Sequence, residues 1–195
     1  MTALTRRLFG ALVIGAVALS AAPSIAQTGT PHLILTIKGG DVDIELLPAL
    51  APKHVARVIE LTEAGAYDGV VFHRVIDGFM AQTGDVKFGK TGAEGFDLSM
   101  AGMGSSDLPD VEAEFNAESF QRGVLGAARS QDPNSFNSQF FITTDDASFL
   151  DGQYTVFGKV ISGMELVDGL EKGPAEQNGA VANPDQIISA KIEYK

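Results

Sequence analysis

The stretch at residues 72–85 reads Phe72-His73-Arg74-Val75-Ile76-Asp77-Gly78-Phe79-Met80-Ala81-Gln82-Thr83-Gly84-Asp85. It begins as an apolar, strand-like run and brings together a permanent cation (Arg74), a primary amide (Gln82) and two large apolar side chains (Phe79 and Met80). Ligand pockets are usually lined by apolar side chains with a few oriented polar groups. The stretch therefore favours a pocket built on a strand, although an ordinary core strand with one surface arginine would give the same local pattern.

Two further stretches of similar composition follow downstream. The first, Gly-Val-Leu-Gly-Ala-Ala-Arg-Ser at residues 123–130, leads through a polar loop into Asn-Ser-Gln-Phe-Phe-Ile-Thr at 137–143. The second, Phe-Leu-Asp-Gly-Gln-Tyr-Thr-Val-Phe-Gly-Lys-Val, occupies residues 149–160. In this order and spacing, the three stretches resemble the cyclophilin-type peptidyl-prolyl cis/trans isomerases, and most closely their bacterial periplasmic branch. The resemblance extends from about Leu33 to Leu170 and is weakest over residues 87–112.

The resemblance implies a site, position by position. Arg74 matches the catalytic arginine and Gln82 the glutamine beside it, while residues 128–130 match a segment whose backbone pairs with the substrate peptide. Phe149 stands where many members have tryptophan, and Tyr154 where many have histidine, so weak binding of the drug cyclosporin is expected. The substrate-binding positions implied in full are Phe79, Met80, Ala128, Arg129, Ser130, Gln139, Phe141, Phe149, Leu150 and Tyr154.

Elementary chemistry gives these residues a mechanism. An X-Pro bond rotates slowly because rotation breaks amide conjugation, with a barrier of about 18–20 kcal/mol. At the twisted transition state the prolyl nitrogen regains a lone pair, so a donor aimed at it binds the twisted state better than the planar states. Arg74 is always charged and suits this role, with Gln82 orienting it and Gln139 holding the substrate carbonyl. The mechanism predicts no proton transfer, nucleophile, metal or cofactor.

The rest of the chain predicts a mainly β fold. Leu33–Ile37, a Gly39-Gly40 turn and alternating apolar residues at 42–46 indicate a hairpin, and a helix is predicted over residues 52–64. The helix has an apolar face of Val55, Val58, Ile59 and Leu61, and a face predicted to be solvated of His54, Arg57 and Glu60. Further strands are predicted at 70–76, 124–128, 140–143, 155–160 and 187–192, and a short helix at 164–170.

These elements indicate an α+β fold, mainly β, with a closed antiparallel β-barrel capped by two α-helices. The resemblance to cyclophilins implies that the barrel is eight-stranded. Residues 87–112 are rich in Gly, Ser, Met and Asp with little periodicity, which is typical of a long surface loop.

The first residues have the pattern of an export signal. Arg6 and Arg7 precede an apolar run from Leu8 to Ala22 that is shorter than the ~20 residues of a spanning helix. Ser24-Ile25-Ala26 offers small residues where signal peptidase cleaves. We expect residues 1–26 to be a cleavable signal peptide, through the general secretory route or the twin-arginine route that Thr5–Phe9 resembles. An uncleaved membrane anchor or an amphipathic helix is the alternative.

Composition excludes several classes of function. The formal net charge of −11 opposes binding to nucleic acid or anionic lipid, and the absence of cysteine excludes disulfide and thiolate chemistry. Gly84–Thr91 matches the phosphate-binding pattern G-x-x-x-x-G-K-[ST], but the residues after it are a poor helix start, which the pattern requires. The three histidines lie in separate elements without metal-ligand spacing. The acidic pairs Asp145-Asp146 and Glu112 with Glu114 have the pattern of solvated charges.

The sequence thus predicts one domain, residues 27–195, that accelerates X-Pro rotation in exported proteins. We expect it to be a monomer in the periplasm, with proline-containing polypeptides as substrates and no stable insertion into a membrane. The competing hypothesis is a cyclophilin-like domain that binds proline-containing segments without turnover. The presence of Arg74 argues against that alternative.

Overall fold

The predicted hairpin is present at the start of the part of the chain that the structure describes. The computed structural model describes residues 29–195, so the predicted signal peptide lies outside the described residues. In the hairpin, Ile37 pairs with Gly40, and Gly39 (φ 101°) turns the chain in a conformation that residues with a side chain rarely adopt.

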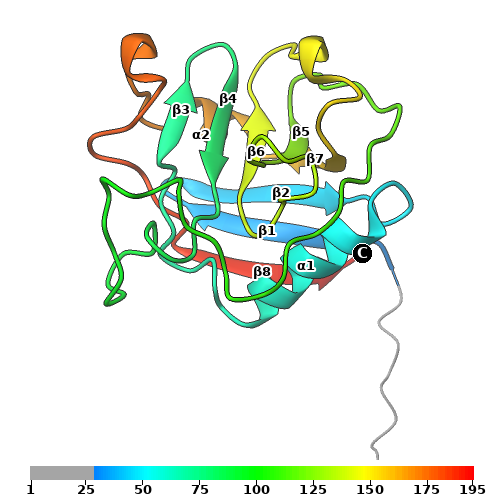
Figure 1. Ribbon diagram of the computed structural model, residues 1–195, viewed down its shortest axis with the longest axis horizontal. Coiled ribbons are helices and arrows are strands. Elements are labelled where there is room, and N and C mark those ends of the chain that lie inside the picture. The colour runs from blue at the N-terminus through cyan, green and yellow to red at the C-terminus, as the bar shows by residue number, and fades with distance from the viewer. Residues whose placement is uncertain (1–28) are drawn as a thin grey trace, which may run out of the picture.

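Eight strands, two α-helices and two 3₁₀ turns make up the described chain (Figure 1). The strands are β1 (Pro31–Ile37), β2 (Gly40–Leu46), β3 (Arg74–Ile76), β4 (Met80–Thr83), β5 (Val124–Ala127), β6 (Phe140–Thr143), β7 (Val156–Ser162) and β8 (Ser189–Tyr194). The helices are α1 (Pro52–Glu63) and α2 (Met164–Asp168), and the 3₁₀ turns are η1 (Ser148–Leu150) and η2 (Ala175–Gln177). The mainly β class and the two helices agree with the prediction.

The predicted closed barrel is wrong, because the sheet is open. Its strand order is β3-β4-β6-β5-β7-β2-β1-β8, and the edge strands β3 and β8 do not pair with each other. The predicted strand at 70–76 is regular only over its last three residues, and Met80–Thr83 forms a strand of its own. Residues 70–72 instead make isolated hydrogen bonds to residues 185–187. Irregular backbone therefore lies where a closed barrel would have a continuous ladder of hydrogen bonds between strands.

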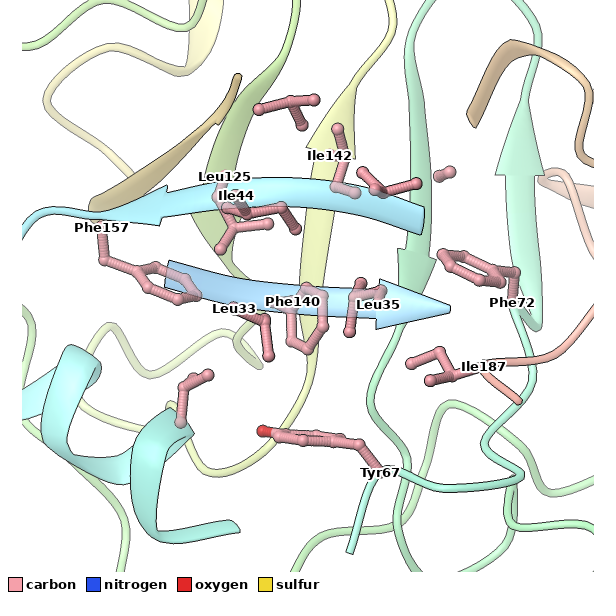
Figure 2. Packing of buried hydrophobic residues seen from close by; sticks show 14 of the residues in the cluster. Leu33, Leu35, Ile44, Tyr67, Phe72, Leu125, Phe140, Ile142, Phe157 and Ile187 are labelled. Carbon is pink, nitrogen blue, oxygen red and sulfur yellow. The ribbon is translucent and has the colours of Figure 1, made fainter. Parts of the chain in front are cut away.

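The core lies between the two halves of this curved sheet. In Figure 1, β1, β2 and β8 form one layer, and β3, β4, β6 and β5 run across it. Figure 2 shows side chains of both halves meeting in the space between, with Tyr67 beneath them. The labelled core residues are Leu33, Leu35, Ile44, Tyr67, Phe72, Leu125, Phe140, Ile142, Phe157 and Ile187.

One face of α1 differs from its prediction. His54 and Arg57 were expected in solvent, but both are buried, whereas Glu60 is exposed. The Arg57 guanidinium donates to the carbonyls of Pro109 and Asn137, and the His54 ring stacks on Phe136. The loops that contribute these groups cover α1, and helical periodicity cannot reveal such a cover.

The predicted loop at 87–112 contains no helix or strand and is fixed by one carboxylate. Asp85 is fully buried and accepts hydrogen bonds from the backbone N–H groups of Lys87, Phe88, Gly102 and Gly104 at 2.7–3.0 Å. No helix follows Lys90, and its ammonium group donates to the carbonyls of Gly65 and Ala66. The phosphate-binding pattern at 84–91 therefore lacks the geometry that its function requires.

No helix within residues 29–195 has the length and apolar character needed to cross a membrane.

Candidate active site

Sheet register brings the predicted catalytic residues into one row. Arg74 on β3 lies opposite Gln82 on β4, Gln82 lies opposite Phe141 on β6, and Phe141 lies opposite Gly126 on β5. Residues directly opposite each other in antiparallel strands project to the same face. A cation, an amide, an aromatic ring and a residue without a side chain therefore lie side by side across four strands.

A small hollow of about 200 Å³ opens beside this row. Ligand pockets for drug-sized molecules are usually about 300–1,000 Å³, so this one fits a single side chain or ring. Every residue that lines it belongs to the set implied by the sequence: Arg74, Phe79, Met80, Gln82, Ala128, Arg129, Phe141, Leu150 and Tyr154.

The apolar wall of the hollow belongs to a second hydrophobic cluster, separate from the main core. Met80 and Phe141 are buried, and the Phe141 ring stacks on Phe120 and meets Tyr154 edge-on. Phe149 is 64% exposed and lies outside the hollow, with its ring 5.4 Å from that of Phe79. Since the buried rings pack on one another, the wall is fixed, and Phe149 extends it toward solvent.

The Arg74 guanidinium is held at two of its three nitrogens. Its Nε and Nη2 atoms donate to the main-chain oxygen and to the side-chain Oδ1 of Asn178, each at 2.9 Å. Its Nη1 atom has only weaker contacts, 3.3 Å to Gln82 Oε1 and 3.7 Å to the thioether sulfur of Met80. A thioether is a poor acceptor, and Met80 lines the hollow, so Nη1 is the nitrogen available to a bound molecule.

A chain of amides supports Gln82. Its Nε2 donates to Gln139 Oε1 at 3.0 Å, and Gln139 Nε2 donates to the carbonyls of Gly102 and Gly104 at 3.1 and 2.7 Å. Both N–H bonds of Gln139 are thus used by the loop. Gln139 can hold a substrate carbonyl, as the sequence suggested, only after releasing one of these bonds. In this arrangement it links the loop to Gln82.

Residues 128–130 lie between this hollow and a larger one of about 420 Å³, which Gln139 and Ser130 also line. The Arg129 guanidinium lies 4.4 Å from the centre of the Tyr154 ring, while the Ser130 N–H donates to Ser135. Among residues 29–195, none forms a hydrogen bond with the main-chain N–H or C=O of Arg129. Its main chain is therefore free to pair with an extended peptide.

Asn178 is the site residue that sequence reasoning missed. It lies 104 residues beyond Arg74 in the chain, in a segment outside the three stretches. Its one local signal was the Asn178-Gly179 dipeptide, which is typical of a turn but says nothing about a site.

Comparison with known proteins agrees with this geometry. Residues 32–192 match the family model of the cyclophilin type peptidyl-prolyl cis-trans isomerases. The chain belongs to this cyclophilin family. It is 57% identical over 192 residues to a probable peptidyl-prolyl cis-trans isomerase of Brucella suis, covering 98% of this chain and 95% of the relative. It is 34% identical to peptidyl-prolyl cis-trans isomerase A of Dickeya dadantii, covering 98% and 100%.

Solved cyclophilin structures share the fold. A cyclophilin-type isomerase of Cryptosporidium parvum, crystallised in the presence of the dipeptide Ala-Pro, superimposes with a TM-score of 0.70 at 28% identity, covering 84% of this chain and 99% of that one. Cyclophilin AquaCyp293 from Hirschia baltica gives a TM-score of 0.66 at 28% identity, covering 82% and 72%. The activity of this chain is that of its family, the cis/trans isomerisation of peptidyl-prolyl bonds.

Proposed function

We propose that this cyclophilin isomerises X-Pro bonds in exported proteins, with Arg74 as the catalytic donor and the 200 Å³ hollow as the proline pocket. The observation that carries the proposal is that Nη1 of Arg74 is bonded only weakly, beside a hollow of the size of one ring that has an apolar wall. The Ala-Pro dipeptide present with the Cryptosporidium parvum relative supports a proline-containing substrate.

The proposed mechanism is electrostatic. The ring of the substrate proline fills the space between Phe79, Phe141 and Leu150, and these side chains exclude water from the imide. A hydrogen bond gains strength where water is excluded. Nη1 of Arg74 leaves the Met80 sulfur and donates to the prolyl nitrogen as that nitrogen becomes pyramidal. The planar states offer no such lone pair, so the bond stabilises the transition state selectively.

Peptide binding extends along residues 128–130 in this proposal. The unpaired main chain of Arg129 holds the residues before proline as an added strand, a mode in which backbone hydrogen bonds give affinity for many sequences. Ala128, Ser130 and Gln139 line the larger hollow along the same path. Tyr154 lies against the Arg129 guanidinium, and Phe149 lies beside Phe79 at the edge of the proline pocket. Such recognition suits a folding assistant with many clients.

The test is an NMR exchange assay on an X-Pro peptide, with Arg74→Ala as the variant. We expect the variant to stay folded and to lose roughly 30- to 1,000-fold in rate, about 2–4 kcal/mol, the scale of a lost transition-state donor. Arg122→Ala is the matched control, because Arg122 is exposed and pairs with Asp168 away from the hollow. It should keep the wild-type rate.

The same assay addresses the rival function, a binding module without turnover. If the wild type and Arg74→Ala exchange the peptide equally slowly while both bind it, the binding-module hypothesis is correct and ours is wrong.

Export is the second part of the proposal. It is supported by the Arg6-Arg7 pair, the short apolar run after it and the small residues at 24–26. Fractionation of cells that express the full chain should place the cleaved protein in the periplasm. Recovery of the uncleaved chain in the membrane fraction would instead favour an anchor.

A further inference from the structure

Asn178 holds two of the three nitrogens of the Arg74 guanidinium with a single residue. Its main-chain oxygen accepts from Nε and its side-chain Oδ1 accepts from Nη2, both at 2.9 Å. An arginine fork bound at two points is fixed in direction as well as in position. The third nitrogen, Nη1, is then the one that faces Met80 and the hollow.

The backbone fixes where Asn178 lies. Its segment runs beside β3: Val75 donates to the carbonyl of Gly179 at 2.8 Å, and Gly173 donates to the carbonyl of Val75 at 3.0 Å. Gly179 must lack a side chain, because a Cβ there would lie 2.4 Å from Ile76 Cγ1. The segment is therefore pressed against the strand that carries Arg74, and the distance between the two residues is set by main-chain contacts.

The conformation of Asn178 also sets it apart. Its φ of 55° is the only positive value at a non-glycine residue within residues 29–195. Asparagine tolerates this left-handed conformation, but glycine adopts it with less strain. In the described chain, the Asn178 side chain makes no hydrogen bond other than the one to Arg74. Its amide oxygen therefore acts on Arg74 alone, while a glycine would satisfy the turn equally well.

We propose that Asn178 is a positioning residue, which holds Nε and Nη2 of Arg74. Before substrate binds, Nη1 then already points at the place that the prolyl nitrogen will occupy. This inference rests on the proposed catalytic role of Arg74. Its physical basis is pre-organisation: a donor already aimed at the place where charge develops needs no reorganisation during the reaction. A half-buried arginine without the clamp would sample several rotamers, of which few aim Nη1 at the hollow.

Asn178→Gly tests the inference, because it keeps the turn and the main-chain oxygen and removes only the amide. We expect kcat to fall about 3- to 10-fold, the worth of one hydrogen bond, with KM unchanged. The Arg74 Nη2–H signals in NMR should shift and exchange faster with water, because Nη2 loses its acceptor. Asn178→Asp keeps an acceptor at the same place and should recover most of the rate. Gln177→Gly, which loosens the same turn one residue earlier, should leave kcat unchanged.

A double-mutant cycle separates positioning from structure. In an Arg74→Ala background, Asn178→Gly should cause no further loss, since its effect passes through the arginine. The inference is overturned if Asn178→Gly keeps the wild-type kcat, or if the two losses multiply. If Arg74→Ala itself keeps the wild-type rate, the proposed function has failed. If only Arg74→Ala loses rate, the function stands and Asn178 has no positioning role.

Discussion

Gly126 shows, at the scale of a single residue, how a missing side chain shapes the proposed proline pocket. A Cβ there would lie 2.3 Å from Cζ of Phe141 and 2.6 Å from Phe120, closer than such atoms approach. Gly126→Val should therefore push the Phe141 ring into the hollow. We expect kcat/KM to fall roughly 10- to 100-fold, as for other ångström-scale displacements in active sites. The exchange assay measures this, with circular dichroism as the control for folding, and an unchanged rate would contradict it.

His73, the neighbour of Arg74, makes stability depend on pH. Burial lowers the pKa of His73 to about 4, with partial compensation by Asp85, whereas an unfolded histidine has a pKa near 6.5. Unfolding therefore takes up a proton between these values, and stability falls as the pH drops from about 6.5 to 4. The loss should reach roughly 3 kcal/mol.

His73→Gln provides the control for this prediction, because its side chain does not titrate. Urea unfolding at several pH values should give a shallower slope between pH 6.5 and 4 for the variant. Burial also lowers the pKa of His54, so part of the slope should persist. An identical slope in variant and wild type would rule out His73 as its source.

At the scale of an element, helix α1 is capped by a residue that is distant from it in the sequence. Its first residue is Pro52, and Ala51 before it offers no side-chain cap. Glu114 instead accepts from the backbone N–H groups of Lys53 and His54 at 3.0–3.1 Å, and from His54 Nδ1 at 2.7 Å. Partial burial raises the pKa of Glu114, but these bonds and the nearby His54 ring outweigh it and hold the pKa below its usual value.

Glu114→Ala should therefore destabilise the fold by about 2–3 kcal/mol, through loss of the cap and of the partner of a buried histidine. Glu112→Ala is the matched control, because Glu112 makes only an exposed ion pair with Lys53 and should leave the free energy of unfolding almost unchanged. Thermal or urea unfolding measures both. Equal losses would show that the cap contributes nothing beyond surface charge.

The elements that the sequence predicted well are those with local signals. The hairpin, α1 and the strands predicted at 140–143 and 155–160, the second observed as β7 at 156–162, follow from periodicity and glycine turns close to each residue. The burial of His54 and Arg57, the role of Glu114 and the open edge between β3 and β8 depend on contacts between remote segments, which no local pattern contains. The pocket residues came from family resemblance, and Asn178 lies in a segment that the matched stretches do not include.

At the scale of the whole molecule, stability without cysteine rests on burial. Two hydrophobic clusters fill the described chain: the larger lies between the halves of the sheet, and the smaller lies beneath the hollow. The smaller cluster contains Met80 and Phe141. The same side chains therefore form the wall of the proposed pocket and contribute to the stability of the fold. Large-to-small changes there should affect both, so activity losses need a stability control.

The arrangement of the chain ends bears on the predicted cleavage after Ala26. Thr30 and Lys195 exchange two backbone hydrogen bonds at 2.8 and 3.1 Å, and β1 pairs with β8 along its length. Within the described residues 29–195, the hollow and both clusters are built from side chains that a chain of residues 27–195 retains. A chain of residues 27–195 keeps all of these contacts, so we expect it to fold with an unchanged unfolding free energy and full exchange activity.

Two measurements check this prediction. Urea unfolding and the exchange assay compare chains 27–195 and 1–195, and N-terminal sequencing of the exported protein should begin at Gln27. A further truncation to residue 34 is the control, because it removes the first residues of β1 and their pairs with β8; it should unfold. If the chain from residue 27 were unstable, residues 1–26 would contribute to the fold, and their assignment as a removable signal would be wrong.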